Sequence, residues 1–300
     1  MTRKYFRVFL SIAICYSCNS NSSKKEKNEE TDAAKKANAS LSYDLLHPQK
    51  KWELPGELKE ISGQAWIDNN HLLAVEDLHP TLYLLSLDST AAIEKTSNFK
   101  DSSDKKFDLE DITVVDEVAY ALWSHGKIYK ITSWQNNPAI QKFNTGLSKE
   151  NNTEGLCYDP VTQKLLVACK DASNIPGEKK SAKAVYSFDM SKNKLDEQPF
   201  LAIHKNDFEK VADQKIDFFP SAIAVHPVTH DIYVLSTRDT KCMAIYSHDG
   251  KFNVIQFIDK ELMPQPEGIC FSPEGKLFIS SEGKKGDPGN LFEFDFAARR

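Results

Sequence analysis

The sequence lacks a strong excess of charge of either sign and a long hydrophobic run. Its 300 residues carry a net charge of −5 and have a pI of about 5.9, so we expect no basic surface for nucleic acid. A mean hydropathy of −0.48 excludes a protein with several membrane spans. The apolar run from Val8 to Ile14 is too short for a transmembrane helix.

Several signatures of catalytic and metal sites are also missing. No pair among the cysteines beyond residue 18 has the CxxC spacing of a zinc or redox site, and neither GxSxG nor HExxH occurs in the sequence. Four cysteines lie in apolar, strand-like runs, and we expect them to be buried thiols: Cys157, Cys169, Cys242 and Cys270. No helical segment of convincing length is present, although DFEKVADQK (207–215) could form a short helix.

The N-terminus has the pattern of an export signal. Basic residues precede the apolar run, and Ser17 then precedes Cys18, which resembles a bacterial lipobox. We therefore expect a lipoprotein signal peptide over residues 1–18, with Cys18 as the lipid site; the alternative is a plain signal peptide cut nearby. Residues 19–45 are polar and charged and should form a disordered tether. The predicted location is the bacterial cell envelope, at the outer membrane (periplasmic or surface face) or the plasma membrane, with membrane contact through the lipid alone.

A hairpin pattern recurs five times after this tether. Each unit has a short polar opening, an apolar strand, a turn, and a second apolar strand that ends in polar residues. The equivalent opening residues are Ser62, Glu110, Glu154, Ser221 and Glu267, at steps of 48, 44, 67 and 46 residues. A third strand follows in every unit and a fourth in four of them, so the repeat predicts an all-β propeller of five four-stranded blades over residues 46–296.

The last unit has three strands, and KKWELPG before the first unit supplies a spare one. If Trp52 to Leu54 pairs outside NLFEFDF, the two ends of the chain close the ring and protect its edges. The long step of 67 residues carries insertions, for which residues 172–183 and 205–219 are the expected places. Six blades, with a degenerate one in that step, and a two-sheet sandwich are the alternatives.

In a propeller, the opening residues and the loops after the second strands meet at one face beside the central axis. Three inner carboxylates, of Glu110, Glu154 and Glu267, would repel one another there unless a proton or cation lies among them. Oxygen ligands suit a hard cation, so these glutamates are the predicted metal ligands and calcium the candidate ion. The alternative is that they hold the ring together by binding backbone amides of neighbouring blades. The predicted binding residues of the outer loops are Glu76, Asp77, His125, Asp171, Arg238 and Glu282.

The motifs EISG, LEDI, TEGLCYDP, SAIAVHPVTHDIYVLS and QPEGICFSPEGKLFISSEGKKGDPGNLFEF resemble the SdiA-regulated family of bacterial propeller lipoproteins. The resemblance covers about residues 50–296 and implies an envelope-anchored propeller. The last two units are also similar to NHL-type repeats. A more distant similarity to esterase-like phytase and calcium-dependent gluconolactonase propellers implies that hydrolysis is an option. WSHG in unit two departs from the family's acidic pair, which weakens the case for a ligand at His125.

Three functions follow from this sequence. The first is a monomeric, lipid-anchored module that binds a small ligand or an envelope protein at this face, with a calcium ion near the axis. The second is a calcium-dependent hydrolase of esters, lactones or phosphate esters, with Asp77, His125 or Asp171 as the base. The third is a scaffold in an envelope protein complex.

Overall fold

The structure is a computed structural model that describes residues 43–99, 107–178, 181–209, 211–212, 215–284 and 286–296. The predicted signal peptide, Cys18 and most of the predicted tether lie outside these residues. Within them, no helix has both the length and the apolar character needed to cross a membrane.

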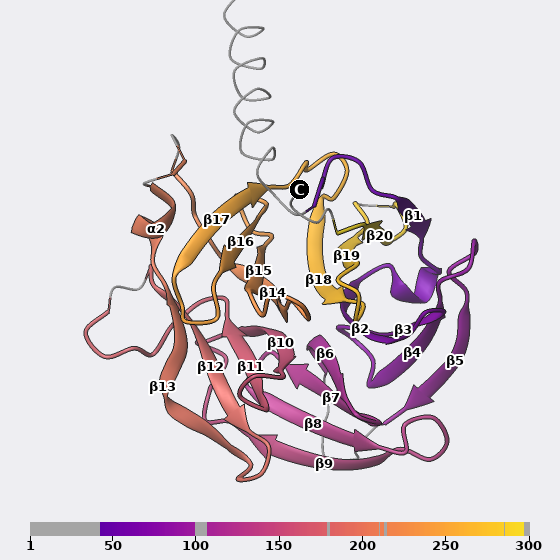
Figure 1. The fold of residues 1–300 in the computed structure, drawn as a ribbon. Helices are drawn as coiled ribbons and strands as arrows, with labels where there is room; N and C mark the ends of the chain where they lie inside the picture. The colour runs from indigo at the N-terminus through magenta and orange to yellow at the C-terminus, as the bar shows by residue number, and fades with distance from the viewer. Residues whose placement is uncertain are drawn as a thin grey trace, which may run out of the picture.

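The strands form five antiparallel sheets of four, one for each blade (Figure 1). Blade 1 consists of β2 (Ile61–Asp68), β3 (His71–Glu76), β4 (Thr81–Ser86) and β5 (Ile93–Asn98). Blade 2 consists of β6 (Leu109–Val115), β7 (Val118–Trp123), β8 (Lys127–Thr132) and β9 (Ala139–Asn144). Blade 3 consists of β10 (Thr153–Asp159), β11 (Lys164–Cys169), β12 (Lys183–Asp189) and β13 (Lys194–Ile203). Blade 4 consists of β14 (Pro220–Val225), β15 (Ile232–Ser236), β16 (Cys242–Tyr246) and β17 (Phe252–Phe257). Blade 5 consists of β18 (Gln265–Phe271), β19 (Leu277–Glu282), β20 (Asn290–Phe294) and the N-terminal β1 (Lys50–Glu53).

The five innermost strands, β2, β6, β10, β14 and β18, contact one another around the central axis (Figure 1). The prediction of five blades is confirmed. The long third step adds the ten-residue β13 and the short helix α2 (Lys205–Glu209), and its described residues contain no sixth sheet. The other helical turn is η1 (Gly56–Leu58), between β1 and β2.

The predicted closure of the ring is also confirmed. Strand β1 pairs antiparallel with β20, and Trp52 lies opposite Leu291. Trp52 is buried in the hydrophobic cluster between blades 5 and 1. A strand from one end of the chain thus covers the edge of β20 and completes the four-stranded sheet of blade 5.

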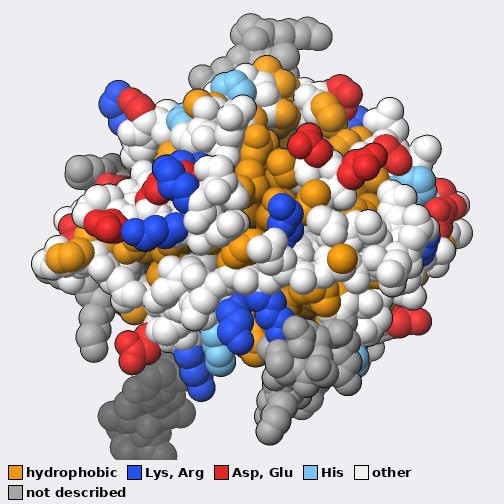
Figure 2. Space-filling view, turned by 90° about the horizontal axis from the view of Figure 1, so that it is seen from below, with side chains coloured by type: hydrophobic (Ala, Val, Ile, Leu, Met, Phe, Trp, Pro, Cys, Tyr) orange, Lys and Arg blue, Asp and Glu red, His pale blue; other side chains and the backbone are white. Residues whose placement is uncertain are grey.

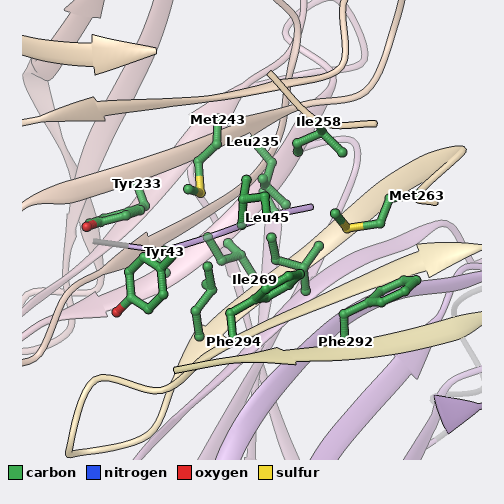
Figure 3. Packing of buried hydrophobic residues seen from close by; sticks show 14 of the residues in the cluster. Tyr43, Leu45, Tyr233, Leu235, Met243, Ile258, Met263, Ile269, Phe292 and Phe294 are labelled. Atoms are coloured by element: carbon green, nitrogen blue, oxygen red, sulfur yellow. The ribbon is translucent and has the colours of Figure 1, made fainter. Parts of the chain in front are cut away.

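The hydrophobic core lies between the blades, and Figure 3 shows the cluster shared by blades 4 and 5. Tyr43 and Leu45 belong to this cluster and are fully buried. The Tyr43 hydroxyl donates to the Gly275 carbonyl and lies 2.9 Å from His226 Nε2. Residues 43–45 are therefore packed, although the predicted tether extends to residue 45. The side chains of Tyr43 and Leu45 are buried here because the facing sides of blades 4 and 5 are apolar.

The four cysteines of the described chain are buried and free, as expected. Cys157 lies opposite Leu166 in the β10–β11 hairpin. Burial raises the pKa of the Cys169 thiol to about 12, which keeps it protonated at neutral pH.

Viewed from the rim, at right angles to Figure 1, the surface carries acidic and basic side chains side by side, with hydrophobic ones between them (Figure 2). This mixture agrees with the small net charge of −5.

Candidate functional site at the propeller mouth

Each innermost strand begins with a β-bulge beside the axis. The register shifts once near the start of β2, β6, β10, β14 and β18, and one residue of each strand is left without a partner. These five residues are the opening residues of the repeat: Ser62, Glu110, Glu154, Ser221 and Glu267. A bulge redirects the side chain of its extra residue. We call the axial end of these strands, with the loops that follow β3, β7, β11, β15 and β19, the mouth.

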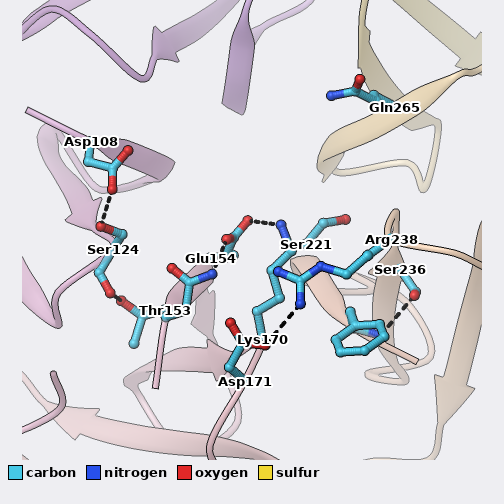
Figure 4. A network of polar contacts seen from close by, with 12 residues as sticks. Asp108, Ser124, Thr153, Glu154, Lys170, Asp171, Ser221, Ser236, Arg238 and Gln265 are labelled. Carbon is cyan, nitrogen blue, oxygen red and sulfur yellow. Dashed lines mark hydrogen bonds and ion pairs between the residues drawn. The ribbon is translucent and has the colours of Figure 1, made fainter. Parts of the chain in front are cut away.

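A lysine lies within the ring of glutamates. Lys170, directly after β11, places its Nζ 2.7 Å from Glu154 Oε2, and both side chains are largely buried (Figure 4). Asn152 donates to the other oxygen of Glu154 at 2.8 Å. Burial lowers the pKa of Lys170, but the negative charges of Glu154, Glu267 and Glu110 raise it by more, so the pKa lies above its usual value. Lys170 is therefore an ammonium group that pairs with Glu154 and is attracted by the charges of Glu267 and Glu110.

One ammonium group does not balance the carboxyl groups around it. Burial raises the pKa of Glu110 well above its usual value, and the charge of Glu154 adds to the shift. The pKa of Glu267 is raised to about 8, mainly by burial, with Lys170 opposing and Glu154 adding. The pKa of Glu154 is raised as well, because its burial outweighs Lys170.

Two of the predicted outer-loop residues join this cluster: Asp77, directly after β3, and Glu282, the last residue of β19. Burial and the charges of Asp77 and Glu60 raise the pKa of Glu282 to about 7. Burial and neighbouring carboxylates, Glu60 first, raise the pKa of Asp77 to about 6. Asp77 Oδ1 is buried and has no hydrogen-bond partner within the described part of the chain.

The other four predicted binding residues make separate contacts. Asp171 and Arg238 pair with each other at 3.1 Å, and the guanidinium of Arg238 lies 4.6 Å from the ring of Phe219 (Figure 4 shows the pair). Glu76 accepts hydrogen bonds from the backbone of its own loop, at residues 78 and 79. His125 stacks on the indole of the nearby Trp123, 5.6 Å between ring centres.

The blades are joined near the mouth by residues other than the glutamates. Asp111, which follows the bulge of β6, accepts the Leu156 N–H of blade 3 at 2.7 Å and the Ile112 N–H of its own strand at 2.8 Å. Ser221 of blade 4 donates to the Pro266 carbonyl of blade 5 at 2.9 Å. Asp111 was not among the residues that we predicted from the sequence. The signal was available, because the other four repeats have glycine or alanine at this position.

The arrangement differs from a preformed metal site. Within the described residues, no group of three or more His, Cys, Asp or Glu side chains is placed to hold a metal ion. Both oxygens of Glu154 are already hydrogen-bonded. The glutamates as arranged fit a shared ammonium group better than calcium, and calcium binding stays a prediction.

Comparison with known proteins now gives the family. The model of the SdiA-regulated family matches residues 41–292, so the chain belongs to the SdiA-regulated family of β-propellers. No curated protein matches the sequence.

Solved structures share the fold at low identity. Glutaminyl cyclase of Myxococcus xanthus is 16% identical, with a TM-score of 0.56 over 84% of this chain and 97% of that one. The PQQ-bound aldose sugar dehydrogenase of Streptomyces coelicolor is 11% identical, with a TM-score of 0.51 over 83% and 97%. A gluconolactonase of Xanthomonas campestris is 15% identical, with a TM-score of 0.49 over 79% and 72%. At these identities, the first two similarities establish the fold alone.

Proposed function

We propose that this protein is an exported, lipid-anchored binding protein of the bacterial envelope, which holds a small positively charged ligand at its mouth. One observation carries the proposal: the bulges direct Glu110, Glu154 and Glu267 to the mouth, where all three act on the Lys170 ammonium group. Glu282, which is affected by the charges of Asp77 and Lys170, adds a further carboxyl group. Buried like charges are stabilised by an added cation. The candidate inorganic ligand is calcium. The candidate organic ligand is a primary amine, whose ammonium group resembles that of Lys170.

Binding of a cation at this mouth should release protons. Glu267 and Glu282, with pKa values of about 8 and 7, hold protons on a fraction of molecules at pH 7. A cation favours the ionised carboxylates and displaces those protons. The expected signature is a binding heat at pH 7 that changes with the ionisation enthalpy of the buffer.

Thermal unfolding tests the proposal directly. A ligand that binds only the folded state raises the melting temperature with its free concentration. We expect calcium or a small diamine to raise it for the wild type, and Glu267→Gln to reduce the effect. Glu117→Gln, on the exposed β6–β7 turn, is the matched control and should behave like the wild type. If neither cation shifts the wild type at millimolar concentration, the proposal is wrong.

A hydrolase is the second candidate, supported by the raised pKa values of Asp77 and Glu282, about 6 and 7. Carboxyl groups that titrate near neutral pH suit general acid–base catalysis. If Asp77 is the base, Asp77→Asn should lower the hydrolysis of an ester, lactone or phosphate ester by roughly 10²-fold or more. Equal rates for the wild type and this variant would exclude Asp77 as the base.

The envelope location has its own test. Cys18→Ala should abolish labelling of the protein by a radioactive fatty acid and move it from the membrane fraction to the soluble fraction. Continued membrane association of this variant would contradict anchoring through a lipid alone.

A further inference from the structure

A cavity of about 110 Å³ lies in blade 3 beside the long insertion, and it shares no lining residue with the carboxyl cluster of the mouth. Its apolar walls come from the end of β13, from α2 and from the segment before β14. The lining includes Lys183, Ile203, Phe208, Ile216, Phe218 and Phe219. Four of these are buried hydrophobic residues of one core cluster: Ile203, Phe208, Ile216 and Phe218.

Lys183, the first residue of β12, supplies a buried cation to this cavity. It is only 5% exposed. Its Nζ donates to the Asp171 backbone carbonyl at 3.1 Å and lies 4.4 Å from the Phe219 ring centre. Among the described residues, no carboxylate lies within ion-pair distance of it. A buried ammonium group without a carboxylate partner is costly and is stabilised by an incoming anion.

The surrounding charges leave positive charge in excess. Arg238 contacts the same Phe219 ring and pairs with the Asp171 carboxylate. Two cations, Lys183 and Arg238, therefore lie near one anion, Asp171. Burial lowers the pKa of Lys183, Asp171 opposes this shift, and Arg238 adds to it. The one acidic group of the lining, Asp217, is compensated by Lys215 at 2.8 Å and by Lys205 at 3.6 Å.

We propose that this cavity binds a small organic acid, with its carboxylate at Lys183 and its apolar body against Ile203, Phe208 and Ile216. An apolar cavity of about 150 Å³ holds benzene. The smaller volume here therefore suits an acid smaller than benzene, with a short alkyl chain, and propionate is the probe of choice. The ligand class is set by the size of the cavity, its apolar walls and the single buried ammonium group.

Calorimetry of the purified protein with propionate tests the proposal. We expect saturable binding of propionate and at least tenfold weaker binding of propionamide, which has the same shape without the charge. Lys183→Met should weaken binding of propionate by roughly tenfold or more, the usual effect of losing a hydrogen bond to a charged group. Lys192→Met is the matched control, because Lys192 is exposed and pairs with Asp189 away from this cavity; it should bind like the wild type.

A second variant covers the case in which Lys183→Met fails to fold. Ser181 is exposed at the edge of the cavity, so Ser181→Trp should obstruct it without disturbing the core and should abolish binding. Glu267→Gln, at the mouth, should leave binding unchanged, which separates this site from the proposed function. Absence of propionate binding, equal binding of acid and amide, or full binding by Ser181→Trp would each overturn the proposal.

Discussion

At the scale of the residue, Glu267 links the chemistry of the mouth to the stability of the protein. Burial raises the pKa of its carboxyl group from 4.5 to about 8, and Lys170 offsets only part of the shift. The folded state therefore keeps this proton over a pH range in which the unfolded chain has lost it. Its contribution to stability is complete below about pH 4.5 and is lost as the pH rises toward 8.

We predict that the melting temperature of the wild type falls between pH 5 and pH 8, and that Glu267→Gln makes this slope shallower. A neutral amide avoids the buried charge, so the variant should melt higher than the wild type at pH 8, on the scale of roughly 2–4 °C for each kcal/mol gained. Scanning calorimetry at several pH values measures both effects, with the exposed Glu117→Gln as control. A wild-type melting temperature that rises across this range would contradict the raised pKa.

At the scale of the element, the start of each innermost strand combines a bulge with a close contact to the next blade. The residue after the bulge in blade 1 is Gly63, and a Cβ added there would lie 2.3 Å from Asp111 Oδ1 and 2.7 Å from Asp111 Cα. Asp111 is held by two backbone hydrogen bonds and cannot move aside freely. The glycine of blade 1 and the aspartate of blade 2 therefore form one joint.

We predict that Gly63→Ala destabilises the protein by about 1–3 kcal/mol, the usual cost of overpacking a tight contact. Urea unfolding monitored by tryptophan fluorescence measures the change. Gly56→Ala is the matched control, because a Cβ there meets no atom within 4 Å. Equal losses in the two variants would mean that the general effect of removing a glycine, rather than the joint, is responsible.

At the scale of the whole molecule, the N-terminal segment closes the ring at two places. Strand β1 covers the edge of β20, and Tyr43 with Leu45 fills the space between blades 4 and 5. The Tyr43 hydroxyl contacts Gly275, in the β18–β19 turn. Because that turn is at the opposite end of β18 from its bulge, the described chain enters the propeller on the face away from the mouth.

We predict that a chain beginning at residue 55 is much less stable than one beginning at residue 43. The shorter chain loses a buried tryptophan, for which removal of the side chain alone typically costs about 3–5 kcal/mol, and it exposes the β20 edge to pairing with other molecules. Thermal unfolding and size-exclusion chromatography should show a lower melting temperature and aggregation. Equal melting of the two chains would contradict closure by β1.

The sequence by itself determined the five blades, their closure and the ring of opening residues. An apolar strand, a turn and a second apolar strand are local patterns, and their repetition placed Glu110, Glu154 and Glu267 at equivalent positions. Only the tertiary structure decided how these carboxyl groups are balanced. Lys170 of blade 3 is also attracted by Glu110 of blade 2 and Glu267 of blade 5, and such effects between blades are encoded by no pattern within one blade. The polar composition of residues 19–45 likewise did not reveal that Tyr43 and Leu45 are buried. The apolar residues that they pack against lie about 180–250 residues further along the chain.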